Sequence, residues 1–525
     1  MKLPNRSGIG IVIAAALSAS PSFQQALAQV SSEAPVEAEP AAEAESEMRI
    51  TAVVVTARQR EENLQDVPLT INTFSADQLT SKGGTSLNDI ALLTPGLNFE
   101  AYATGGYPVI TLRGLSATSI LSAENNVSSF FAGIYLPRAY MIDPGLAGLQ
   151  RVEVVKGPQS ALYGRNAFAG AINYVPLSAP DHLTLDTYVT AGTDERFDYG
   201  LTAGGPLIDG YVNAIAGYAS SSFDGTWSNA HPNADAEAGG TTDKMGGWES
   251  EASFATVEVT PTDSLRFTLG INHLERDTEA TGRYNISRDN GDGNCSLVGG
   301  VNQFFCGELP VLEAIVDPRS TGLVSTSDVY RFDAEYDLSE TLTAFYQYGR
   351  IDSDAYSYDQ TSINSVSGDT ASGVQFLGLP VGNVEADSHE LRLSYDTGAT
   401  KATAGAFYSD LRDDYKTTLV FGTPLATQPI TPATAQIRVQ DVLTEVLTKS
   451  VFASVSQDFS DGLINIAIEG RYTEEEKTSY DRLSGSVSEA TFDSFTPRFV
   501  AQYNVSEYSN VYASAAKGVK SGGFN

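Results

Sequence analysis

The feature that most constrains the fold of this chain is an alternation of apolar and polar side chains from residue 182 onward. In the clearest runs, residues 265–271, 391–395 and 464–468, Leu, Ile or an aromatic residue recurs at alternate positions. Successive side chains of a β-strand point to opposite faces, so this period predicts strands with one apolar and one polar face. Such strands suit either a sheet half exposed to water or a barrel wall that faces lipid.

The number of these segments and the lengths of their connections favour the barrel. We count about 13 or 14 strand-like segments. The chain also contains 25 Tyr and 23 Phe, residues that suit the aromatic girdles at membrane interfaces. Short connections alternate with long ones, as in outer-membrane barrels: residues 205–210, 260–264 and 337–341 are short, and residues 223–248, 275–327 and 415–445 are long.

Charge and missing motifs exclude several functions. The chain has 32 Lys and Arg against 65 Asp and Glu, a net charge of −33 with neutral histidine. This charge repels phosphate backbones, so we expect no nucleic-acid partner. Phosphate-binding loops, nucleophile elbows and CxxC motifs do not occur, and the His389-Glu390 pair lacks the second histidine of a zinc-protease motif. We therefore expect no enzyme activity, no metal site and no cofactor.

The N-terminus has the features of an export signal. Lys2 and Arg6 precede an apolar stretch that is too short to span a membrane, and an Ala-Leu-Ala cleavage site ends at residue 28. Residues 1–28 are therefore predicted to be a secretory signal peptide. Residues 29–49 form a leader rich in Glu and Ala without aromatic residues, which is predicted to be disordered because it cannot bury enough surface to fold.

A strand-prone peptide, residues 50–58, directly follows this leader. It is rich in β-branched residues, yet it stands between a disordered run and a polar stretch and has no sheet partner nearby. Two interpretations remain open. The peptide is either the first strand of the following domain or a docking segment that adds an edge strand to the sheet of a partner.

The following segment, up to residue 181, mixes helix and strand signals and is predicted to be a small α/β domain. The residues from Ser75 to Gln78 form a capping box that begins one short helix. A second helix begins near residue 86 and ends before Pro95. The predicted strands are residues 69–74, 110–112 and 151–155.

The most specific motif of the chain lies between residues 150 and 175. It reads RVEVVKGPQSALYGRN from residue 151 and GAINYV from residue 170. It resembles the plug motif of TonB-dependent outer-membrane receptors nearly residue for residue, and the Arg-Gly pair at residues 113–114 is similar to a second motif of that family. Two positions depart from the family pattern: Lys156 stands where many relatives have Arg, and Ala132 where an Asp is frequent.

This resemblance implies the domain order of the family. Residues 50–58 would be the TonB box, residues 59–181 an α/β plug domain, and residues 182–525 part of a transmembrane antiparallel β-barrel around the plug. A plugged barrel of this family has about 22 strands, so about eight are missing here. Residues 517–525 also resemble an internal segment, and we therefore expect the chain to be a fragment with an incomplete barrel.

The resemblance also implies roles for individual residues. TonB would bind the box by strand addition, through Ile50, Thr51, Ala52, Val53, Val54, Val55 and Thr56. Charged plug residues would form an ion network with acidic residues on the inner wall of the barrel; they are Arg113, Arg151, Glu153 and Arg165. An ordinary surface ion network is the alternative for these four residues.

Two stretches of the plug segment, residues 100–108 and 116–128, lack any strand pattern and are predicted to be flexible loops. In the family, such loops form the apex that faces the outside and contacts the substrate. Tyr102 and Tyr107 are therefore candidate substrate contacts. Packing of these two rings against the barrel is the alternative.

The two cysteines, Cys295 and Cys306, lie in the long connection at residues 275–327. Because the chain is predicted to be exported, we expect them to form a disulfide. A metal site built on two cysteines would lack further ligands.

For function, the resemblance implies TonB-dependent uptake of a scarce ligand across the bacterial outer membrane, with a ferric siderophore as the family's default substrate. Cobalamin and oligosaccharides are alternative substrates, and a non-transporting surface binder is the alternative function. The implied partners are TonB with ExbB and ExbD, outer-membrane lipid, and a small-molecule ligand such as a metal chelate.

Overall fold

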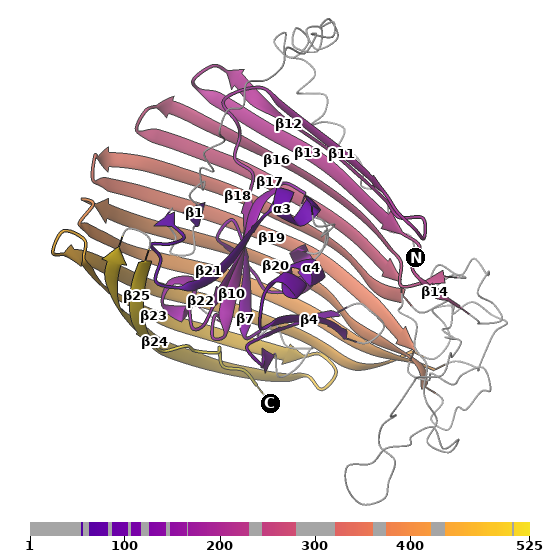
Figure 1. Cartoon of the computed structure of the whole chain (residues 1–525). Coiled ribbons are helices and arrows are strands. Elements are labelled where there is room, and N and C mark those ends of the chain that lie inside the picture. The colour runs from indigo at the N-terminus through magenta and orange to yellow at the C-terminus, as the bar shows by residue number, and fades with distance from the viewer. Residues whose placement is uncertain are drawn as a thin grey trace, which may run out of the picture.

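A large curved β-sheet and a smaller domain that lies against it make up most of the described part of the chain (Figure 1). A computed structural model describes residues 54–55, 62–81, 87–102, 107–116, 125–142, 147–164, 166–229, 244–279, 321–360, 374–421, 436–506 and 509–524. A curved 13-stranded sheet carries a smaller plug domain on its concave side. None of the helices in these ranges is long and apolar enough to cross a membrane.

The large sheet is an antiparallel meander, because each strand pairs with the strand that follows it in the sheet. Its 13 strands agree with the predicted number, and they continue further into the long connections than the sequence pattern indicated. They are β11 (Thr184–Ala191), β12 (Phe197–Ile208), β13 (Val212–Phe223), β16 (Trp248–Thr262), β17 (Leu265–Glu279), β18 (Thr321–Ser339), β19 (Leu342–Gln360), β20 (Val374–Asp396), β21 (Thr400–Phe421), β22 (Gln436–Phe459), β23 (Ile464–Asp481), β24 (Ser486–Ser506) and β25 (Ser509–Ala516).

The burial of the two faces distinguishes between a sheet half exposed to water and a barrel wall that faces lipid. Leu269, Leu391 and Ile468 expose 50%, 54% and 60% of their surface, whereas the neighbouring Thr268 and Glu469 are buried. A half-exposed sheet in water would bury the apolar residues and expose the carboxylate. The polar face is therefore the inner one, toward the plug, and the apolar face is the outer one, as in a barrel that faces lipid.

The plug is a mixed domain built on a five-stranded sheet in the order β3-β9-β10-β7-β8. Its core includes Ile90, Leu112, Val154 and Ile172, all buried. The sheet strands are β3 (Thr70–Ser75), β7 (Val127–Phe131), β8 (Ile134–Leu136), β9 (Leu149–Lys156) and β10 (Gly170–Pro176), and the helices are α3 (Ala76–Ser81), α4 (Leu87–Leu93), η1 (Ala139–Ile142) and α5 (Ser160–Tyr163).

Three smaller sheets complete the described structure. One contains β4 (Leu97–Tyr102), β5 (Tyr107–Leu112) and β6 (Leu115–Ser116), so the prediction of a loop over residues 100–108 was wrong at both of its ends. Ladder hydrogen bonds between β4 and β5 stabilise strands that the side-chain pattern does not reveal. The other two sheets pair β1 (Val54–Val55) with β2 (Glu62–Asn63), and β14 (Trp227–Ser228) with β15 (Lys244–Met245).

The predicted capping box at the start of α3 is confirmed. The backbone N–H of Gln78 donates to Ser75 Oγ at 3.1 Å, and the backbone N–H of Ser75 donates to Gln78 Oε1 at 3.2 Å. The two bonds satisfy donors that a helix N-terminus otherwise leaves unpaired.

We expect Ser75→Ala to lower the free energy of unfolding by about 1 kcal/mol, because the Gln78 N–H loses its acceptor. Hydrogen exchange at the amides of α3 measures the effect, and it should accelerate in the variant. Unchanged exchange at Gln78 would contradict the capping role.

Candidate functional site

The candidate site is the interface between the plug and the inner face of the large sheet, which we call the wall. The signature segment predicted from the sequence lies at this interface. Gly157, with φ 96°, makes the turn after β9, and Gly164, with φ 82°, ends the short helix α5. Both conformations favour glycine, which explains two glycines of the motif.

The buried Arg471 of β23 binds the end of α5. Its Nη1 donates to the Leu162 carbonyl at 3.2 Å, and its Nη2 donates to Ser450 Oγ at 2.6 Å. The guanidinium also lies over the rings of Phe407 and Phe452, at 5.2 Å and 5.0 Å from their centroids. A Cβ at Gly164 would lie 3.1 Å from its Cζ, so this glycine also lets the guanidinium approach the plug backbone.

A second wall arginine, Arg498 of β24, acts in the same way at another point of the plug. It forms a buried ion pair with Glu469 at 3.2 Å, and its Nη2 donates to the Pro68 carbonyl at 3.4 Å. Because both charges of the pair are removed from water, their mutual contact offsets part of the desolvation cost.

A plug arginine makes the reverse contact. Arg138, which lies between β8 and η1, pairs with Asp413 of β21 at 2.7 Å, and both side chains are almost fully buried. Nearby, Gln347 of β19 donates to the carbonyl of Ala132 at 3.0 Å. Ala132 has φ 51°, a conformation that Asp adopts more readily than Ala, at the position where the sequence departs from the family pattern.

The last described segment of the chain also contacts the signature. The Val519 N–H donates to Ser160 Oγ, and the Ser521 N–H donates to Asn166 Oδ1, both at 3.2 Å. From the wall, Lys477 Nζ donates to the Gly522 carbonyl at 2.6 Å. Residues 519–522 therefore lie between the plug signature and strand β23.

The four charged plug residues predicted from the sequence do not lie together in one cluster of the described structure. Arg151 pairs with Glu153 at 2.8 Å, two residues along β9, and Glu153 is fully buried and also accepts from Asn173. Arg113, with φ 53°, is exposed in the turn between β5 and β6, and no ion pair joins it to another described residue. Arg165 lies outside the described residues. An ion network of these four with the wall stays a prediction.

Burial shifts the pKa values of two further side chains in the plug, Lys156 and Tyr163. Desolvation, with a smaller effect of the Arg113 charge, lowers the pKa of the Lys156 ammonium, whose Nζ donates to the Pro95 carbonyl at 2.8 Å. Desolvation, with a smaller effect of Glu153, raises the pKa of the Tyr163 phenol. The Tyr163 phenol is therefore neutral at physiological pH.

The remaining predicted site residues are only partly described. Tyr102 and Tyr107 form the last cross-strand pair of the β4–β5 hairpin, and their contact with substrate stays a prediction. In the predicted TonB box, Val54 pairs with Asn63 and Val55 with Glu62, and Val55 is buried. Residues 50–53, Thr56, Cys295, Cys306, the signal peptide and the leader lie outside the described residues.

Sequence reasoning missed Arg138, Arg471 and Arg498. The alternation of β23 contained a signal for one of them: Ile464, Ile466 and Ile468 share the outer face, so odd-numbered residues such as Arg471 must face inward. Nothing comparable marks Arg138, which lies in a turn. Within the described ranges, no group of three or more His, Cys, Asp or Glu side chains could hold a metal ion.

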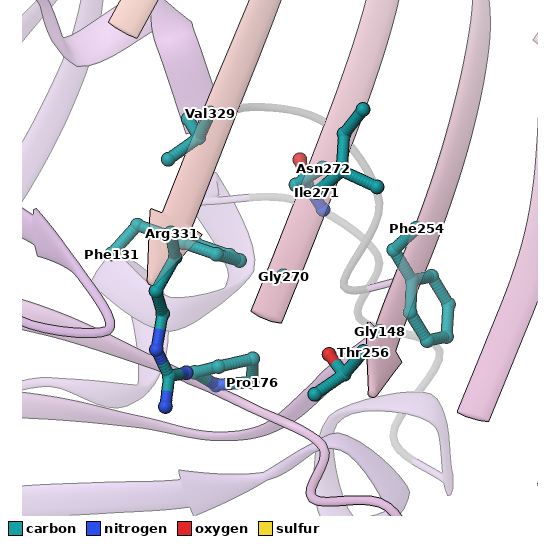
Figure 2. Close-up of a pocket in the computed structure, with 10 residues that line it drawn as sticks. All are labelled: Phe131, Gly148, Pro176, Phe254, Thr256, Gly270, Ile271, Asn272, Val329 and Arg331. Atoms are coloured by element: carbon teal, nitrogen blue, oxygen red, sulfur yellow. The ribbon is translucent and has the colours of Figure 1, made fainter. Parts of the chain in front are cut away.

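At another point of the described interface the plug packs closely against the wall. Figure 2 shows a small cavity where Phe131, Gly148 and Pro176 of the plug meet β16, β17 and β18. Its volume of about 10 Å³ accommodates no more than one water molecule. A Cβ at Gly148 would lie 2.6 Å from the ring of Phe254, so the glycine allows this close contact.

Comparison with known proteins agrees with this geometry. Residues 63–171 match the family model described as "TonB-dependent Receptor Plug Domain". The chain is 30% identical to a hemin receptor of Yersinia enterocolitica over 164 residues, which are 30% of this chain and 23% of that protein. It is 29% identical to the vitamin B12 transporter BtuB of Vibrio vulnificus over 168 residues, 31% of this chain and 27% of that protein.

Solved structures show the same fold. The ferric yersiniabactin uptake receptor FyuA from Yersinia pestis superposes with a TM-score of 0.67 at 16% identity, covering 86% of this chain and 64% of that chain. The siderophore receptor PiuA from Acinetobacter baumannii gives a TM-score of 0.68 at 17% identity, covering 88% and 66%. The chain therefore spans less than two thirds of these receptors.

Proposed function

Because this chain carries the plug domain and the strand architecture of the TonB-dependent outer-membrane receptors, we propose that the protein takes up a scarce small-molecule ligand across the bacterial outer membrane. The observation that carries the proposal is a plug seated by buried hydrogen bonds on a polar wall whose outer face is apolar. A plug of this kind closes a passage that must be opened for transport.

A ferric siderophore is the favoured cargo. Solved relatives named for ferric yersiniabactin, ferric citrate and ferric preacinetobactin support this choice. Relatives named for hemin and vitamin B12 make those two ligands the nearest alternatives. Increased expression under iron starvation, but not under cobalamin starvation, would support an iron chelate.

The proposed mechanism uses strand addition at the predicted box. The outer membrane has no ATP, so the work comes from the inner membrane, where about 2.3 kcal/mol per charge is available for each 100 mV. TonB, energised with ExbB and ExbD, pairs with residues 50–56 and pulls on the plug. Among the described residues Val54 pairs with Asn63 and Val55 with Glu62, and strand addition by TonB would replace this pairing.

Deletion of residues 50–56 from the intact receptor tests this function. Uptake of a radiolabelled ferric siderophore should be lost while binding at the cell surface persists. A deletion of equal length in the leader, residues 36–42, is the control and should leave uptake unchanged. If the box deletion leaves uptake unchanged, the proposed coupling to TonB is wrong.

A further inference from the structure

The plug contacts the wall through two regions of different chemistry. The first, which we call the polar contact, joins α5 to β23 and β24, near one end of the described sheet (Figure 1). The inward positions of these two strands carry a series of buried polar and charged side chains: Glu469, Arg471, Thr473, Glu475, Lys477, Thr496 and Arg498.

Hydrogen bonds and a small polar cavity make up the polar contact. Thr496 Oγ1 donates to the Ser160 carbonyl at 3.3 Å, in addition to the bond from Arg471 to the Leu162 carbonyl. A cavity of about 10 Å³, enough for one water molecule, lies at this contact. One carboxylate and five hydroxyls form its polar lining: Glu475, Ser160, Thr473, Ser494, Thr496 and Ser521. Water can replace hydrogen bonds of this kind, so separation of plug and wall here would hydrate the polar groups at little cost.

The second region, which we call the apolar contact, joins β8 and η1 to β18–β21 in the middle of the sheet. One buried hydrophobic cluster contains side chains of both partners: Ile134, Leu136, Tyr140 and Met141 of the plug, and Leu323, Val329, Ile351, Ala355, Val384 and Leu411 of the wall. A Cβ at Gly349 of β19 would lie 2.6 Å from Ile134 Cγ1, so β8 and β19 are in close contact. Separation here would expose hydrocarbon to water, which is unfavourable in proportion to the exposed area.

The chain that leads from the predicted TonB box enters the plug beside the polar contact. The Pro68 carbonyl accepts its hydrogen bond from Arg498 of β24, and Asn510 of β25 donates to the Gln65 carbonyl at 2.7 Å. Thr70 Oγ1 lies 3.4 Å from the hydroxyl of Tyr512, also on β25. A pull on the box would therefore act first on contacts with β24 and β25, and the apolar contact lies several strands away.

We propose that the plug turns about the apolar contact and that the ligand passes through the polar contact, between α5 and strands β23 and β24. This inference rests on the proposed function, because it names the route that the ligand takes. Hydroxyls, a carboxylate and a guanidinium group lie along this route, so it suits a hydrophilic ligand that exchanges hydrogen bonds with water for hydrogen bonds with the wall. The apolar contact stays closed and holds the plug in the barrel while the route is open.

Two matched single-cysteine variants of the intact receptor test this route, with Cys295 and Cys306 replaced by Ser. Thr496→Cys lies in the polar contact and Ala355→Cys in the apolar contact, and both positions are buried. In cells with an energised inner membrane, a small maleimide should label residue 496 about tenfold faster than in cells treated with a protonophore, because only the polar contact opens. Labelling of residue 355 should be the same in both conditions. Deletion of residues 50–56 should remove the acceleration at residue 496.

Two disulfides, each added to the Thr496→Cys variant, test the inference independently. A Cβ at Gly518 would lie 3.1 Å from Pro158 Cβ, so a small shift lets Pro158→Cys and Gly518→Cys form a disulfide across the polar side. Ile134→Cys with Gly349→Cys forms one across the apolar contact. Labelling of residue 496, measured by mass spectrometry of its peptide, should be lost with the first disulfide and retained with the second. Reduction of the first disulfide should restore labelling, which excludes a folding defect.

Several results would overturn the inference. They are acceleration at residue 355 alone, at both residues or at neither, retained labelling of residue 496 with the first disulfide, and loss of labelling with the second. Failure of the proposed function gives a different result. If uptake persists after deletion of residues 50–56, the coupling to TonB is wrong whichever contact opens.

Discussion

Replacement of Arg138 by methionine is expected to destabilise the seating of the plug by about 3–5 kcal/mol, because it leaves a buried carboxylate without its cation. The pair joins Arg138 Nη2 to Asp413 Oδ2 at 2.7 Å, and the other oxygen of Asp413 has no hydrogen-bond partner among the described residues. Native-state hydrogen exchange at the amides of β7 and β8 would measure the loss.

Two controls separate the buried pair from charge removal in general. The double variant Arg138→Met with Asp413→Leu should recover most of the stability, because no charge then remains buried. Arg266→Met removes a pair with Glu335 that is 3.8 Å long and about half exposed, and it should cost no more than about 1 kcal/mol. If Arg138→Met is as mild as Arg266→Met, the buried pair does not hold the plug.

Gly170→Ala is expected to disrupt the plug sheet and to lower the free energy of unfolding of the plug by about 3 kcal/mol or more. Overpacking alone costs about 1–3 kcal/mol, and here the added Cβ would collide with backbone atoms of a neighbouring strand. A Cβ at this position would overlap the Val155 carbonyl oxygen and lie 2.5 Å from a methyl group of Leu112. The carbonyl belongs to the internal strand β9, which is paired on both sides, and cannot move without breaking its ladder to β3 and β10. Hydrogen exchange at the amides of β9 and β10, followed during chemical denaturation, measures the effect.

Gly114→Ala is the matched control for this substitution. Gly114 has φ 78°, yet a Cβ there would meet no atom within 4 Å. It should therefore cost only the conformational penalty of about 1–2 kcal/mol. Equal effects of the two substitutions would show that backbone conformation, and not the clash with Val155, accounts for the glycine in the signature.

Local signals in the sequence were sufficient for several elements. The capping box at Ser75 and the end of α4 before Pro95 depend on hydrogen bonds and steric restrictions within a few residues, so they could be predicted without the fold. The β4–β5 hairpin could not, because its strands are stabilised by pairing with each other and not by a marked side-chain pattern.

The contacts that seat the plug could not be predicted from local pattern. Arg138 and Asp413 are 275 residues apart, Arg471 and Leu162 are 309 apart, and Arg498 and Pro68 are 430 apart. Alternation places Arg471 on the inner face of its strand, but it does not identify the plug carbonyl that the guanidinium meets. Which plug carbonyl accepts the hydrogen bond from Arg471 depends on the position of the plug against β23 and β24.

The sequence by itself determined the strands of the large sheet and their number, the two helices α3 and α4, and the signature segment, because each follows from periodicity or hydrogen bonding over a few residues. Only the tertiary structure decided which face of the strands is outermost, since one alternation serves a sheet in water and a wall in lipid equally well. Burial of Glu469 and exposure of Ile468 settled it. The physical reason is that burial is a property of the assembled sheet and plug, in which residues far apart in sequence remove one another from solvent.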